Sequence, residues 1–226
     1  AECRSLTRLP YLSSAGTQDK VLMQFSDIPG YARQKSNLTQ MVQGDKMPHA
    51  LLFAGPEGNG KLALALALAQ LVLCRNRTVH DSCGSCPSCS KATRYIHPDI
   101  HFSFPTIGSN VVSDMHLPQW REALIHAPWL SKNYWAMALA GEKEGGNKQL
   151  NINKEECSKI IQKLSFKSFE SGHKILIQWL PEYLGNEANR LLKMIEEPPE
   201  KTLIIFVTEQ TDQILPTLIS RCQLVK

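Results

Sequence analysis

The chain has 226 residues, of which 42% are hydrophobic and 20% charged, and its formal net charge is +4. This is enough for one sizeable core with a small appendage, and the mildly basic balance permits contact with nucleic acid without demanding it. The longest apolar run, residues 62–73, is shorter than the roughly 18–20 residues that span a bilayer, which excludes a membrane-spanning helix.

Residues 1–22 show neither helical nor strand periodicity, and they lack the charged, apolar and small-residue succession of a secretory signal. We therefore expect a poorly ordered extension at 1–22. We also expect a cytoplasmic protein without a membrane partner. Residues 23–226 would form the folded domain, which begins with a short entry segment and an amphipathic helix.

Apolar runs alternate with helical patterns along the rest of the chain. Buried strands are predicted at 49–54, 100–104, 174–179 and 203–207, and helices at 61–73, 120–126, 157–164, 186–197 and 214–219. Residues 105–150 read as an insertion packed around tryptophans and a tyrosine, with a flexible loop at 141–148. Strands that alternate with helices indicate an α/β fold, with a mostly parallel sheet flanked by helices.

A glycine-rich loop, residues 55–61 (GPEGNGK), joins the first predicted strand to the helix that follows it. This is the layout of a P-loop, in which backbone N–H groups face phosphates and a lysine reaches the outer ones. The residues predicted to contact phosphate are Gly55, Gly58, Gly60 and Lys61. The next residue is Leu62, where an active site needs Ser or Thr to bind Mg²⁺.

The strand at 174–179 is the candidate for the second Mg²⁺-binding element, which should end in acidic residues. Trp179 and Leu180 stand at those places, and Glu182 lies beyond a proline. Because Leu62 and this strand end remove ligands from the same ion, the sequence argues against Mg²⁺ and against hydrolysis of ATP in cis. Binding of ATP through the loop is left open, as is a loop that is now only a structural turn.

Four of the seven cysteines lie within sixteen residues and include two CxxC steps. Such spacing predicts a closed tetrahedral zinc site with a structural role, at Cys74, Cys83, Cys86 and Cys89. An iron–sulfur cluster is the rival interpretation, since CxxCxxC also occurs there. Four unrelated buried thiols are a third. The neighbouring histidines read as ordinary surface or strand residues: His80, His97 and His101.

Two C-terminal segments carry a family resemblance: residues 185–200 read GNEANRLLKMIEEPPE, and residues 214–222 read ILPTLISRC. With the four cysteines after the P-loop helix and the sequence His97-Pro98-Asp99, they resemble the P-loop, RecA-like AAA+ domains of bacterial DNA polymerase III clamp-loader subunits. The resemblance covers roughly residues 23–225. In that family gamma/tau subunits keep an intact ATPase site and delta-prime subunits often do not, so the altered site favours the delta-prime type.

The resemblance implies roles for two further residues. Arg221 would be an arginine finger that reaches the ATP site of a neighbouring subunit, and Thr208 would be a nucleotide-sensing position. It also implies a hetero-oligomer with gamma/tau and delta subunits, and indirect contact with the sliding clamp and primer-template DNA. The lid and C-terminal collar domains of the family have no counterpart in residues 1–226, so we expect a fragment.

The expected function is that of a non-catalytic clamp-loader subunit that supports assembly and lends Arg221 to its neighbour. Two alternatives stay open. One is an active gamma/tau-type ATPase that recruits Glu182 or another carboxylate. The other is a zinc-module nucleic-acid binder with a vestigial P-loop, although Lys91 and Arg94 beside the cysteines form no basic stripe.

Overall fold

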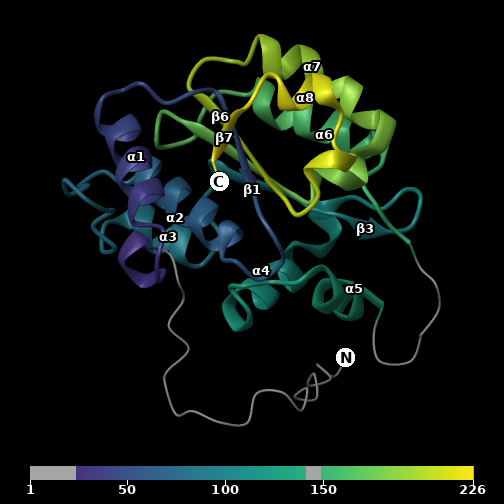
Figure 1. Cartoon of the computed structure of the whole chain (residues 1–226), viewed down its shortest axis with the longest axis horizontal. Helices are drawn as coiled ribbons and strands as arrows, with labels where there is room; N and C mark the ends of the chain where they lie inside the picture. The colour runs from purple at the N-terminus through teal and green to yellow at the C-terminus, as the bar shows by residue number, and fades with distance from the viewer. Residues whose placement is uncertain (1–23, 141–148, 226) are drawn as a thin grey trace.

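The computed structural model describes residues 24–140 and 149–225. The extension expected at 1–22 and the loop expected at 141–148 lie outside the described residues. No helix within the described ranges is long and apolar enough to cross a membrane. Figure 1 shows a central sheet between two groups of helices, with α1 to α3 on one side and α6 to α8 on the other.

Five strands form the central sheet in the order β2-β5-β6-β1-β7, and every pairing is parallel. Their bounds are Ala50–Ala54 (β1), Ile100–Ser103 (β2), Lys174–Trp179 (β5), Thr202–Thr208 (β6) and Gln223–Val225 (β7). β5 and β6 lie inside the sheet and are buried at every residue, which is why both are mostly apolar rather than alternating. The predicted α/β fold with a parallel sheet is confirmed.

Alternate residues of the strands supply two apolar cores, one on each face of the sheet. One core packs against α1 (Ala32–Gln43), α2 (Lys61–Leu73), α4 (Leu117–His126) and α5 (Lys132–Ala140). The other packs against α6 (Lys154–Ser165), α7 (Asn189–Glu196) and α8 (Pro216–Ile219). α2 is buried at every residue except Val72, because it lies between the sheet and other helices.

Shorter elements complete the chain: η1 (Phe25–Asp27), α3 (Pro87–Thr93), η2 (Ser113–His116), η3 (Pro181–Ala188) and η4 (Thr211–Gln213). Two helices begin later than the sequence pattern indicates. α7 begins at Asn189 rather than 186, since η3 precedes it and contains Gly185 with φ 50°. α8 begins at Pro216, a residue suited to the first helical position, rather than at 214.

The segment predicted as an insertion is closed at its base by two short antiparallel strands, β3 (Thr106–Ile107) and β4 (Leu150–Asn151). Between them α4 and α5 pack through an aromatic cluster. The ring centroids of Trp120 and Trp135 lie 5.2 Å apart, and Trp120 lies 4.2 Å from Phe104 and 5.1 Å from Trp179 of β5. These contacts fix the insertion against the end of the central sheet.

Candidate functional site

The glycine-rich loop lies between the carboxyl end of β1 and the first turn of α2. Two of its residues need glycine because their backbone is left-handed: Gly58 has φ +74° and Gly60 has φ +84°. The backbone N–H of Gly55 donates to the carbonyl of Thr208 at the end of β6 (3.4 Å). The structure therefore brings the predicted loop residues and Thr208 to one edge of the sheet.

The Lys61 side chain is buried and turned back onto its own loop. Its Nζ donates to the carbonyl oxygen of Pro56 (2.9 Å) and lies 3.9 Å from a carboxylate oxygen of Glu209. Burial lowers the pKa of Lys61, an effect that the charges of nearby glutamates oppose. Burial likewise raises the pKa of Glu209, and the Lys61 charge opposes that shift. The Lys61 ammonium is thus engaged by groups of its own chain.

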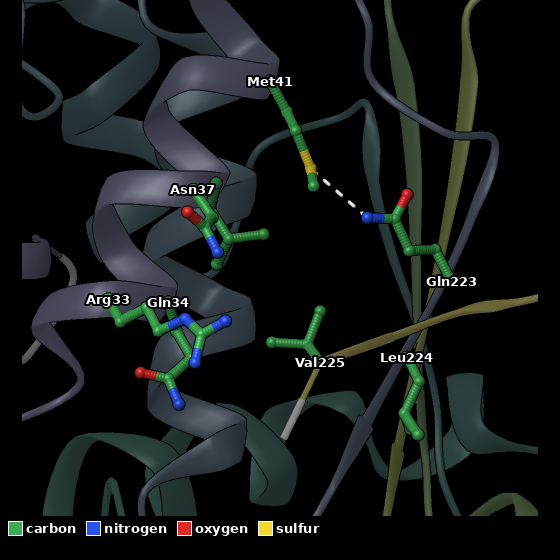
Figure 2. A pocket seen from close by; sticks show the side chains of 8 residues that line it. Arg33, Gln34, Asn37, Met41, Gln223, Leu224 and Val225 are labelled. Carbon is green, nitrogen blue, oxygen red and sulfur yellow. Dashed lines mark hydrogen bonds between the residues drawn. The ribbon is translucent and has the colours of Figure 1, made fainter.

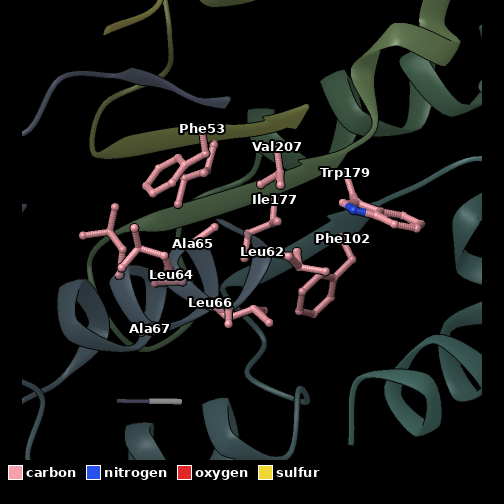
Figure 3. Close-up of a cluster of buried hydrophobic side chains, with 14 of the residues drawn as sticks. Phe53, Leu62, Leu64, Ala65, Leu66, Ala67, Phe102, Ile177, Trp179 and Val207 are labelled. Atoms are coloured by element: carbon pink, nitrogen blue, oxygen red, sulfur yellow. The ribbon is translucent and has the colours of Figure 1, made fainter. Parts of the chain in front are cut away.

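The positions that should bind Mg²⁺ are filled by apolar side chains. Leu62 is 4% exposed, and Trp179 and Leu180 are almost fully buried. Figure 3 shows Leu62, Phe102 and Trp179 within one buried cluster. Glu182 is partly buried beyond the strand end, where its carboxylate accepts hydrogen bonds from Thr208 and from the backbone of Glu209.

One residue of this site was expected from the sequence only to pack within the insertion. Trp129, in the turn between α4 and α5, lies directly on the glycine loop: a Cβ built on Gly60 would be 1.8 Å from Cζ3 of the indole. The space left there measures about 10 Å³, and it is lined by Gly58, Gly60, Lys61, Leu62, Trp129, Leu130 and Trp179. That volume is about the space that one water molecule needs.

The four predicted cysteines come together around one point. Cys74 caps the end of α2, Cys83 lies in the following loop, and Cys86 and Cys89 begin α3. All four sulfur atoms lie within 4.8 Å of one another, with Cys74–Cys83 at 3.6 Å and Cys83–Cys89 at 3.9 Å. Thiolates in a tetrahedron at about 2.3 Å from a metal would lie about 3.8 Å apart. The cluster therefore fits a metal ion, and no histidine belongs to it.

Backbone amides prepare the cluster for negative charge. The N–H groups of Cys83 and Cys86 donate to the sulfur atoms of Cys74 and Cys83, both at 3.3 Å. The amides of Ser85 and then Cys86 lower the pKa of Cys83 to about 6, although partial desolvation opposes them. Burial raises the pKa of Cys89 instead.

A buried polar network ties this cluster to the segment before β5, which sequence reasoning missed. The Asp99 carboxylate accepts backbone N–H bonds from Glu170 and Ser171, both at 3.0 Å, and another from Phe169. His97, read from the sequence as an ordinary residue, contacts the hydroxyl oxygens of Ser88 on α3 (3.0 Å) and of Ser171 (3.1 Å). The network fixes α3 against the body of the domain.

Arg221 lies at the end of α8, and the structure does not bring it to the glycine loop. Its Nε donates to a carboxylate oxygen of Glu196 (2.7 Å), and its Nη1 donates to the carbonyl of Thr217 (2.6 Å). The side chain is 32% exposed. The guanidinium is therefore at the surface, in a solvent-accessible ion pair.

A groove of about 300 Å³ lies elsewhere, between α1 and the edge strand β7. Figure 2 shows the side chains that line it, with the amide of Gln223 directed at the sulfur of Met41. The lining residues are Arg33, Gln34, Asn37, Leu38, Met41, Gln223, Leu224 and Val225. None of the predicted site residues belongs to this groove.

Comparison with known proteins identifies relatives of this chain. A family model described as DNA polymerase III, delta subunit, matches residues 30–226. DNA polymerase III subunit delta' of Bacillus subtilis (strain 168) is 29% identical over 82% of this chain and 44% of the relative. The subunit delta' of Yersinia pestis is 31% identical over 77% of this chain and 40% of the relative.

A subunit of another type is also similar: DNA polymerase III subunit tau of Bacillus subtilis (strain 168) is 28% identical over 88% of this chain and 28% of the relative. The chain thus spans less than half the length of these curated relatives. The family match covers most of the described domain, including the cysteine cluster and the glycine loop. The chain belongs to the DNA polymerase III delta subunit family, as a clamp-loader subunit of the delta-prime type.

Proposed function

We propose that this chain acts in DNA replication as a non-catalytic subunit of the DNA polymerase III clamp loader. It supports assembly with gamma/tau and delta subunits and supplies Arg221 to the ATP site of a neighbour. Through that complex it acts indirectly on the sliding clamp and primer-template DNA. The proposal rests on one observation. In this member of the delta-prime family, the positions at the glycine loop that would bind Mg²⁺ are occupied by apolar side chains, which offer no oxygen ligand.

The loss of ATP hydrolysis in cis follows from the lack of oxygen ligands for Mg²⁺. Mg²⁺ needs oxygen ligands in a near-octahedral arrangement, and Leu62 offers none. Glu182 is engaged with Thr208 and Glu209, and Glu209 in turn lies beside Lys61. A gamma/tau-type ATPase would need one of these carboxylates to leave its partner and hold the ion, so the contacts argue against that alternative.

The surface position of Arg221 supports a role in trans. A guanidinium from a neighbouring subunit stabilises charge that develops on the transferred phosphoryl group, and such a finger contributes about 10³–10⁵ in rate. The ion pair with Glu196 is solvent-accessible, and pairs of this kind contribute at most about 1 kcal/mol. Exchange of the Glu196 carboxylate for a partner's phosphate would therefore cost little.

The cysteine cluster is proposed to hold zinc. Four thiolates satisfy tetrahedral Zn²⁺ completely and leave no position for water, so the ion would hold the 74–89 module folded and take no part in catalysis. An iron–sulfur centre uses the same ligands. A colourless protein with one zinc per chain supports the zinc assignment, whereas visible absorption with bound iron contradicts it.

The test of the function is reconstitution of the full-length protein with its partner subunits. Arg221→Ala should lower DNA-stimulated hydrolysis at the neighbouring site by about 10³-fold or more while the complex still assembles. Arg190→Ala is a matched control, because Arg190 is also an exposed arginine in an ion pair with a glutamate. Hydrolysis that is unchanged by Arg221→Ala rejects the finger, and Lys61-dependent hydrolysis by the isolated chain rejects the non-catalytic assignment.

A further inference from the structure

We infer that Trp129 is an intramolecular plug of the glycine loop, which keeps ATP phosphates out by occupying their place. This goes beyond the missing Mg²⁺ ligands, whose loss accounts for lost hydrolysis but does not by itself exclude nucleotide from the loop. The inference rests on the proposed function in one respect: it takes the glycine loop to be a former phosphate-binding site that no longer supports ATP hydrolysis. It gives the 105–150 insertion a role.

The plug is defined by the contact between the indole and Gly60. Phosphates bind P-loops at the helix N-terminus, where the backbone N–H groups of the loop and of the first helical turn converge. Gly60 is the residue that precedes the first turn of α2. Three carbon atoms of the Trp129 ring lie within 2.9 Å of the place where a Cβ of Gly60 would stand. The ring therefore lies directly against Gly60 at the start of α2, with Trp129 36% exposed and about 10 Å³ left beside it.

Trp129 belongs to a turn whose neighbouring residues pack firmly against the rest of the domain. Trp129 and Leu130 lie in the turn between α4 and α5, and Leu130 is buried at 4% exposure. On α5 the indole N–H of Trp135 donates to the carbonyl of Pro105 (2.8 Å), and its ring contacts Phe104 at 5.0 Å. Because the turn is anchored on both sides of Trp129, holding the indole beside the loop costs little additional conformational entropy.

Hydrogen-bonding groups of the glycine loop also have partners within the chain itself. The backbone N–H of Lys61 donates to Oδ1 of Asn59 (3.2 Å), and its ammonium donates to Pro56. On the other side the Tyr31 hydroxyl donates to the carbonyl of Asn59. Two donors that a phosphate would use are therefore occupied by the chain itself. Removing the indole would free the approach, and a phosphate could then replace these internal partners.

The experiment measures ATP binding to the full chain by equilibrium dialysis with labelled ATP. The unmodified chain should show no saturable binding at about 1 mM, and Trp129→Ala should bind at least about 10-fold more tightly, equivalent to about 1.4 kcal/mol. Because Leu62 gives Mg²⁺ no oxygen, binding to the variant should be equal in Mg²⁺ and in EDTA. Adding Lys61→Ala should abolish it. Met137→Ala, at an exposed position of α5, is the matched control and should behave as the unmodified chain.

A folded Trp129→Ala variant that binds no better than the unmodified chain overturns the plug, and so does saturable binding by the unmodified chain. Should Trp129→Ala fail to fold, Trp129→Leu repeats the test with a smaller apolar side chain. Hydrogen exchange of residues 55–61 in the unmodified chain is independent of any variant: protection on addition of ATP contradicts the plug, and unchanged exchange supports it. ATP hydrolysis by Trp129→Ala would reject the non-catalytic role and leave the plug intact, so the two ideas fail separately.

Discussion

The hydroxyl of Thr208 donates a hydrogen bond of 3.0 Å to Glu182, and this contact joins the carboxyl end of β6 to the segment that follows β5. The other carboxylate oxygen of Glu182 accepts the backbone N–H of Glu209 (3.1 Å). The candidate nucleotide sensor and the candidate metal-binding carboxylate are therefore partners of each other. In an ATPase these groups would face the nucleotide, whereas here they stabilise the edge of the sheet.

Replacing Thr208 with Val should destabilise the domain. The substitution keeps the shape of a fully buried side chain but leaves a Glu182 carboxylate oxygen without its donor and the backbone N–H of Gln210 without its acceptor, at a cost of about 1–3 kcal/mol in the free energy of unfolding. Urea denaturation measures the change. Thr217→Val, at an exposed position of α8, should alter stability by less than about 0.5 kcal/mol. Equal effects of the two variants would show that the two hydrogen bonds of the Thr208 hydroxyl contribute nothing.

Removal of the metal should unfold the cysteine module. Structural zinc sites carry an apparent binding free energy of about 10–16 kcal/mol, as large as the stability of a domain. A strong chelator should therefore release one zinc per chain and lower Tm, and Cys89→Ser should prevent full loading. Cys222→Ser should keep the metal, because Cys222 lies outside the cluster. Metal content that is unaffected by Cys89→Ser would contradict the assignment.

The parts of this site that could be predicted from sequence are those encoded locally. The cysteine cluster follows from short spacings that a turn and a helix start bring together, and the glycine loop follows from its place between a strand and a helix. Strands β5 and β6 were predictable because burial on both faces produces mostly apolar segments, Ile175–Ile177 in β5 and Leu203–Val207 in β6.

What could not be predicted depends on contacts between distant segments. Trp129 meets Gly60 only because α4 and α5 dock on the sheet through the aromatic cluster, and no local pattern encodes that contact. The strand β7 was missed since it has three residues, all of them at least partly exposed, and so no readable period. The role of Asp99 as acceptor for three amides of a segment 70 residues away is equally non-local.

His101 makes stability depend on pH. Burial, with a smaller contribution from Lys163, lowers the pKa of His101 to about 4. The unfolded chain, with a His pKa of about 6.5, therefore binds more protons between these values, and the contribution to stability is full above pH 6.5 and is lost as the pH falls towards 4. Partial exposure of the ring limits the loss between pH 7.5 and 5 to about 1–2 kcal/mol.

His101→Gln should remove that part of the pH dependence, as measured by urea denaturation at both pH values. The exposed His80 provides the control, since His80→Gln should leave the dependence unchanged. Any loss of metal from the cysteines at low pH affects both variants alike and cancels in the comparison. Identical pH profiles for the two variants would mean that His101 does not resist protonation in the folded chain.

Restoring the missing oxygen at position 62 should not restore hydrolysis. Leu62→Thr supplies one ligand, but β5 still ends in Trp179 and Leu180, and the indole of Trp129 still covers the loop. The variant should also lose about 1–3 kcal/mol of stability, because it places a hydroxyl in an apolar cluster. Leu224→Thr, at an exposed position of β7, makes the same chemical change and should cost far less. Mg²⁺-dependent turnover by Leu62→Thr alone would mean that a carboxylate already present completes the site, as in a gamma/tau-type ATPase, and that the indole does not exclude ATP.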